Sequence, residues 1–215
     1  MTLAFSTARD IPRGADLLAV PAVKGGALPA GGTAAVEVDA AFLAARGFGG
    51  ELGETLPLLA DDGGTVLVVG VGDAAGVDPG VIRRAAAAAV RGAGTATTLA
   101  TTLLDALAPG ADRARAAQAL AEGAALGAYR FVPYKSAAPD RPLEQVVVLT
   151  RAGTSIGRSL QRGAAVAAAV VLARDLVNEP ATAMTPRRMA EMAEVIAGRA
   201  GLALTVLDER QIVAE

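Results

Sequence analysis

The 215-residue chain contains no cysteine, no histidine and no tryptophan. Without cysteine it can form neither disulfides nor thiolate metal sites, and without histidine it lacks the commonest zinc ligand and the commonest general base. Ser136, Ser155 and Ser159 have neither a glycine elbow nor a histidine partner, so a serine nucleophile is unsupported. Much of the familiar catalytic repertoire is therefore excluded.

Strong charge and long apolar runs are also missing. Twenty basic and 22 acidic residues give a net charge of −2, so we expect no binding to nucleic acid or to an anionic membrane. The longest stretch without a charged residue, 92–104, is shorter than the ~20 apolar residues that span a bilayer. The N-terminus shows no secretion signal, and we expect a cytoplasmic location.

The chain is rich in apolar residues, which make up 53% of the sequence and suffice for a buried core. Strand patterns alternate with helix patterns along the chain. Strands are predicted at 17–20, 35–38, 65–69, 95–104 and 145–150, and helices at 40–46, 79–91, 111–127, 156–178 and 186–200. This alternation predicts an α/β fold with a mainly parallel sheet flanked by helices.

The last part of the chain reads as an unfinished domain. Asn178-Glu179-Pro180 ends the long helix and is predicted to be a structural hinge. After the next helix, 202–208 has a strand pattern with no later strand to pair with it, although a parallel strand needs a neighbour. We therefore expect this segment, and the apolar face of helix 186–200, to lack cover.

A glycine-rich turn follows the strand at 65–69. Gly70-x-Gly72-x-x-Ala75 formally matches the dinucleotide fingerprint, whose glycines let the backbone approach a pyrophosphate. The next helix begins too late, near Pro79, and no acidic residue stands ~20 positions beyond the motif. An ordinary strand-to-loop turn is the favoured interpretation, and nucleotide binding by this loop is the alternative.

Two other groups of residues could carry chemistry. Carboxylates could hold magnesium or manganese without histidine, but they are scattered and no cluster has recognisable ligand spacing, so no metal or catalytic residue is assigned. Tyr129, Phe131 and Tyr134 crowd beside Arg130 and Lys135, a mixture that can stack on nucleic-acid bases. We favour a loop whose aromatic residues anchor it to the core while the basic residues face water.

Two ordered motifs resemble a known family. Glu122-Gly123 with Leu126-Gly127, then Tyr129-Arg130-Phe131 and Tyr134-Lys135, is similar to the "EG…LG.YRF..YK" signature of leucyl (cytosol) aminopeptidases. The segment 173–180, ARDLVNEP, followed by Thr185-Pro186 and by "GL…VLDE" at 201–209, resembles the passage from their N-terminal domain to their catalytic domain. The resemblance is clear from about 120 to 210 and weak before that.

The resemblance implies a macro-domain-like N-terminal α/β domain at 1–150, a connecting helix at 151–178 and the start of a second, incomplete α/β domain at 179–215, the catalytic peptidase domain. It implies a hexameric enzyme that uses two divalent ions, zinc or manganese, to release N-terminal residues from peptides. The family's metal ligands and catalytic residues lie beyond "VLDE". We therefore expect this chain to be inactive alone.

Two other functions stay open. A stand-alone binding or assembly module would take a nucleotide-like ligand near 70–76 or a protein partner. A DNA-binding regulatory role ranks third, because it requires a salt-dependent complex that the net charge of −2 does not favour.

Overall fold

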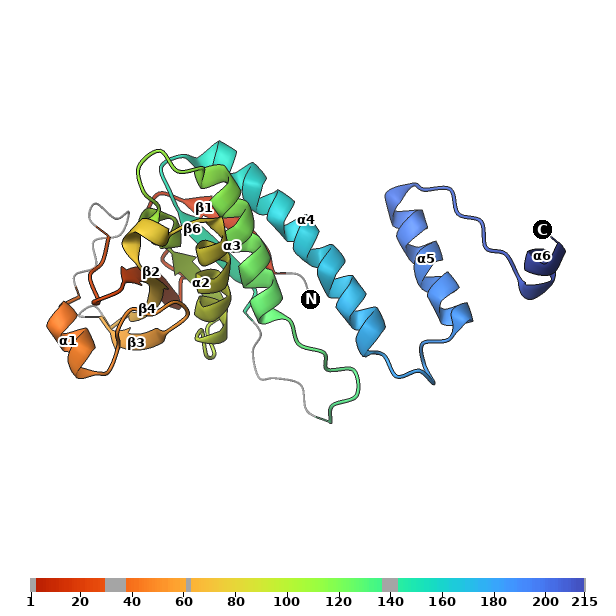
Figure 1. The fold of residues 1–215 in the computed structure, drawn as a ribbon, viewed down its shortest axis with the longest axis horizontal. Coiled ribbons are helices and arrows are strands. Elements are labelled where there is room, and N and C mark those ends of the chain that lie inside the picture. The colour runs from red at the N-terminus through yellow and green to blue at the C-terminus, as the bar shows by residue number, and fades with distance from the viewer. Residues whose placement is uncertain (1–2, 30–37, 61–62, 137–142, 215) are drawn as a thin grey trace. The chain divides into compact units, whose positions relative to one another are not determined.

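The computed structural model describes residues 3–29, 38–60, 63–136 and 143–214, and its strands form one six-stranded sheet (Figure 1). The strands are β1 (Ala4–Ala8), β2 (Leu17–Val23), β3 (Thr55–Leu59), β4 (Thr65–Gly72), β5 (Thr98–Thr101) and β6 (Gln145–Leu149). Their order is β1-β6-β5-β2-β4-β3, and every neighbouring pair is parallel except β3 with β4. The predicted α/β fold with a mainly parallel sheet is confirmed.

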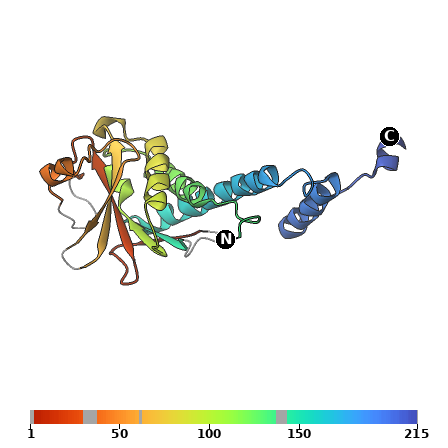
Figure 2. The same ribbon diagram turned by 90° about the horizontal axis from the view of Figure 1, so that it is seen from below.

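Helices cover both faces of this sheet. The helices of the chain are α1 (Ala40–Ala45), α2 (Pro79–Arg91), α3 (Arg113–Ala128), α4 (Gly153–Asn178), α5 (Pro186–Ala200) and α6 (Glu209–Ala214), with 3₁₀ turns at Ala74–Gly76 and Leu103–Ala106. Of these, α5 and α6 belong to a separate compact unit and not to the sheet. Figure 2 shows α2, α3 and the first part of α4 on one face of the sheet and α1 on the other. Within the described ranges, no helix is long and apolar enough to cross a membrane.

Side-chain caps fix where the helices begin. The Asp78 carboxylate accepts a hydrogen bond of 2.8 Å from the Val81 N–H, and Pro79 occupies the first turn of α2, as the sequence predicted. At the other end of the chain, Thr185 caps α5 and Gly201 ends it with a left-handed φ of 65°. These local signals satisfy backbone groups that a helix end leaves unpaired.

The strand β4 contributes side chains to two apolar cores, one on each face of the sheet. Leu67 and Val69 pack in the core beneath α2 and α3, whereas Val66 and Val68 pack in the core on the α1 side, with Leu43. All four β4 residues are buried, which explains their continuous apolar run, because a strand covered on both faces has no polar side.

The strand predicted at 95–104 is shorter than expected. β5 spans only Thr98–Thr101, and a 3₁₀ turn follows at Leu103–Ala106. The Thr101 hydroxyl donates to the Ala19 carbonyl and accepts from the Leu103 N–H, so the chain turns there although its residues stay apolar. The helix boundaries agree with prediction within a few residues.

Two strands, β1 and β3, were not predicted from the sequence, and both lie at sheet edges. An edge strand has one partner strand and a weaker apolar pattern. β3 also contains Pro57, and proline disfavours the prediction of a strand. The strand predicted at 35–38 falls almost wholly outside the described residues.

The chain divides into two compact units, Met1–Val171 and Leu172–Glu215. The sheet and its covering helices belong to the first unit. The second contains the end of α4, then α5 and α6.

The prediction of a strand at 202–208 is wrong, because the structure gives 202–207 no strand partner and leaves these residues exposed. The domain limits at 150 and 178 stay a prediction.

Candidate functional site

The Glu122–Gly127 motif forms a close crossing between α2 and α3. The Glu122 carboxylate is buried and accepts hydrogen bonds from Arg83 Nε at 3.0 Å, Arg83 Nη2 at 2.6 Å and Gln118 Nε2 at 2.8 Å. A Cβ added to Gly123 would lie 2.0 Å from the Arg83 carbonyl oxygen, and one added to Gly127 would lie 2.9 Å from the Ala87 backbone. The motif is therefore a packing device, with the buried charge matched by Arg83.

Gly70 and Gly72 serve close backbone packing. A Cβ at Gly70 would lie 2.0 Å from the Glu51 carbonyl oxygen, and Gly72 has a φ of 75°. The Gly72 N–H also donates to Gly50, and its carbonyl accepts from the Lys24 N–H. The segment at 49–54 thus occupies the space beside Gly70, and backbone packing is sufficient to explain this glycine.

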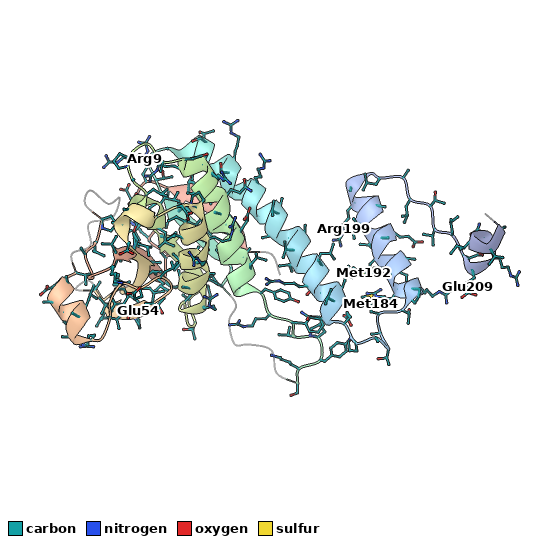
Figure 3. The ribbon with its side chains drawn as sticks, in the orientation of Figure 1. Arg9, Glu54, Met184, Met192, Arg199 and Glu209 are labelled. Atoms are coloured by element: carbon teal, nitrogen blue, oxygen red, sulfur yellow. The ribbon has the colours of Figure 1, made fainter. Side chains whose placement is uncertain are left out.

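A polar turn completes this contact. The Glu54 carboxylate (Figure 3) accepts from the N–H groups of Gly49 and Glu51. Glu51 in turn pairs with Lys24 at 2.8 Å, and both side chains are more than half exposed. These bonds hold the segment at 49–54 against the carboxyl ends of β2 and β4.

The Lys24–Glu51 ion pair is expected to affect how the stability of the fold depends on pH. The hydrogen bond to Glu51, then the charge of Glu51 and that of Asp73, raise the pKa of Lys24 above the usual 10.5. A raised folded-state pKa gives stability that is present below the unfolded value and is lost as pH rises through the folded value. We expect Glu51→Gln to lower the pKa of Lys24, measured by NMR titration with Lys135 as the reference signal. An unchanged Lys24 titration would contradict the pairing.

The aromatic and basic residues after α3 are only partly anchored. Tyr129 and Phe131 are half-buried, while Arg130 and Lys135 are exposed, as expected. Tyr134 differs from the expectation because it is 61% exposed. Its ring lies 6.0 Å from that of Phe131 and is tilted by 47°, so one aromatic residue covers the other at the surface.

Carboxylates do not gather into a metal site in the described part of the chain. No group of three or more acidic side chains there could hold a metal ion. Asp78 and Asp112 cap helices, Asp105 pairs with Arg113, and Glu122 pairs with Arg83. These four carboxylates thus have structural partners.

The second unit has an extensive apolar surface. Ala197 is its only buried residue among those described. A segment of this size without a core is not stable by burial of its own apolar surface. Its exposed large apolar side chains are Val177, Met189, Val195, Ile196, Leu202, Leu204, Val206, Leu207, Ile212 and Val213.

Comparison with known families identifies the part of the chain that contains the crossing motif. The model of the cytosol aminopeptidase family, N-terminal domain, matches residues 20–138, which is more than half of the chain. The chain belongs to the cytosol aminopeptidase family. The resemblance seen in the motifs is thereby confirmed, and the match extends well upstream of residue 120, where the motifs were weak.

Two bacterial proteins are similar to much of the chain. A probable cytosol aminopeptidase of Mycobacterium marinum is 45% identical over 137 residues, covering 62% of this chain and 25% of the relative. That of Mycobacterium leprae is 36% identical over 189 residues, covering 83% and 34%. This aminopeptidase-family chain therefore spans about a quarter to a third of the length of these curated relatives.

Solved structures show the same fold. The bottromycin maturation enzyme BotP is 37% identical, with a TM-score of 0.77, over 93% of this chain and 41% of that one. A tomato leucine aminopeptidase variant matches with a TM-score of 0.82 over 99% of this chain and 46% of that one. Its identity of 23% shows the fold alone.

Proposed function

We propose that this chain forms the N-terminal domain and the first part of the catalytic domain of a metal-dependent leucyl aminopeptidase, which releases N-terminal amino acids from peptides. The observation that carries the proposal is the family match at 20–138, together with relatives of which the match covers only 25% and 34%. The complete enzyme would use two zinc or manganese ions, act as a hexamer and work in the cytoplasm.

The described residues do not fit the two metal ions. No group of three or more acidic side chains converges in these parts of the chain, and histidine and cysteine are absent from the sequence. Two-metal peptide hydrolysis needs ligands that hold both ions beside the scissile carbonyl. We therefore assign no step of the hydrolysis to this chain, whose part would be structural.

The uncovered second unit supports this division. Its helix α5 begins at the Thr185 cap and ends at Gly201, yet the apolar side chains of the unit have no core of their own. Exposed apolar surfaces of this extent mark contact with another polypeptide segment. In the proposed enzyme, the rest of the catalytic domain covers them.

The purified 215-residue chain is expected to release no leucine from leucine amide with added manganese or zinc, because its described residues contain no metal site. The measurement is a discontinuous amine assay, with an intact cytosol aminopeptidase as the positive control. Metal-dependent release that copurifies with the chain would contradict this expectation.

The size of the native gene product tests whether this chain is part of a longer aminopeptidase. We expect immunoblotting and intact mass spectrometry of the source cell to show a product much larger than 21.3 kDa, with aminopeptidase activity. A native product of 21.3 kDa would instead favour the stand-alone binding or assembly module.

A further inference from the structure

A polar groove lies on the outer surface of the helix layer, within the first unit. Its volume is about 690 Å³, which falls in the range of small-molecule sites. The lining comes from the first turns of α2, from one stripe of α3 and from α4 near Arg162. Neither the loop at 70–76 nor the second unit contributes a residue to its lining.

Two close helix crossings build this groove. Gly123 lets α3 approach α2 at Arg83, and Gly163 lets α4 approach α3, because a Cβ at Gly163 would lie 2.3 Å from the Gln118 carbonyl oxygen. Arg115 lies one turn before Gln118 on α3, and Arg162 adjoins Gly163 on α4. Both arginines therefore flank the same crossing and line the same groove.

The carboxylates of the groove are already engaged. Glu122 is paired with Arg83. Asp78 and Asp112 each accept a hydrogen bond from their own helix, at the Val81 and Arg115 N–H groups respectively, where the positive end of the helix offsets part of their charge. The acidic side of the groove is thus largely compensated from within.

The arginines are not compensated to the same degree. Arg115 and Arg162 are exposed, and among the described residues neither guanidinium group has a hydrogen-bond or ion-pair partner. Arg83 uses Nε and Nη2 on Glu122 and is still 46% exposed. The groove therefore offers more donors than acceptors, from guanidinium groups whose planar N–H pairs match phosphate oxygens.

We propose that this groove binds the phosphate group of a small anion, held between Arg115 and Arg162. The lining is polar, which favours a charged ligand over an apolar one. The phosphate could be free or carried by a nucleotide, and both present the same oxygens to the guanidinium groups. Such a ligand would join α3 to α4 and stabilise the packing of the helix layer.

Isothermal titration of the 215-residue chain at low salt tests this site, with inorganic phosphate, adenosine monophosphate and adenosine as the probes. We expect saturable phosphate binding with a dissociation constant of about 1 mM or tighter. The R115Q/R162Q variant should weaken it at least about tenfold, since two charged partners are lost. Arg158→Gln is the matched control, because Arg158 is an exposed arginine of the same helix outside the groove.

Each outcome decides the question. Adenosine monophosphate binding at least as tightly as phosphate, with adenosine not binding, would support a nucleotide source, and phosphate binding more tightly would support the free anion. Absence of saturable phosphate binding would overturn the proposal. Equal binding by R115Q/R162Q and by the control would also overturn it, as would adenosine binding as tightly as its monophosphate.

Discussion

Replacing Gly123 by alanine is expected to destabilise the first unit by about 3 kcal/mol or more, which lowers the midpoint of thermal unfolding by roughly 10 °C. The added Cβ would lie 2.0 Å from the Arg83 carbonyl oxygen and 2.9 Å from the Arg83 Cα. Both are backbone atoms, so relief requires α2 and α3 to move apart. That movement would disturb the bonds between Arg83 and the buried Glu122.

Gly157→Ala is the matched control for this experiment. Gly157 lies in α4, and a Cβ added there meets nothing within 4 Å. Alanine should raise stability by about 0.5–1 kcal/mol, because glycine is the poorer helix former. Urea unfolding followed by circular dichroism measures both variants, and equal stabilities would contradict the assignment of Gly123 to helix packing.

Replacing Gly70 by alanine should have an effect of similar size in the absence of any ligand. The added Cβ would lie 2.0 Å from the Glu51 carbonyl oxygen and 2.8 Å from the Gly50 carbonyl carbon. The segment at 49–54 would have to leave the end of β4, with loss of the bond from the Gly70 N–H to the Glu54 carbonyl. We expect a loss of about 3 kcal/mol, measured by thermal and urea unfolding.

Gly76→Ala separates packing from ligand binding at this loop. A Cβ at Gly76 meets nothing within 4 Å, so its effect should stay within about 0.5 kcal/mol. If the Gly70→Ala variant were instead as stable as the original chain and had lost binding of a nucleotide, that result would support the dinucleotide-fingerprint interpretation. Gly72 is a poor position for this test, because its φ of 75° makes any side chain strained.

Most helices and the central strands were predictable because their signals are local. Asp78 with Pro79, and Gly201 after α5, mark helix ends through hydrogen bonds within a few residues. The run at 65–69 predicted a strand buried on both faces because 66–69 are consecutive apolar residues. The edge strands β1 and β3 lack such signals, since each has one partner and one open side.

The sequence could not predict which residues meet across the fold. Gly70 and Glu51 are 19 positions apart, and Arg83 and Glu122 are 39 positions apart. Their contacts depend on strand order and helix crossing, which no local pattern encodes. The same limit hid the groove at Arg115 and Arg162, because its residues come from three helices.

By itself, the sequence determined the family, the α/β class and the absence of cysteine and histidine chemistry, because ordered motifs and composition are properties of the chain alone. The tertiary structure decided what the motif residues do. It assigned Gly70 and Gly123 to close backbone contacts and Glu122 to a buried ion pair, and it left 202–207 without a strand partner. Those roles follow from distances between segments far apart along the chain, and only the fold sets such distances.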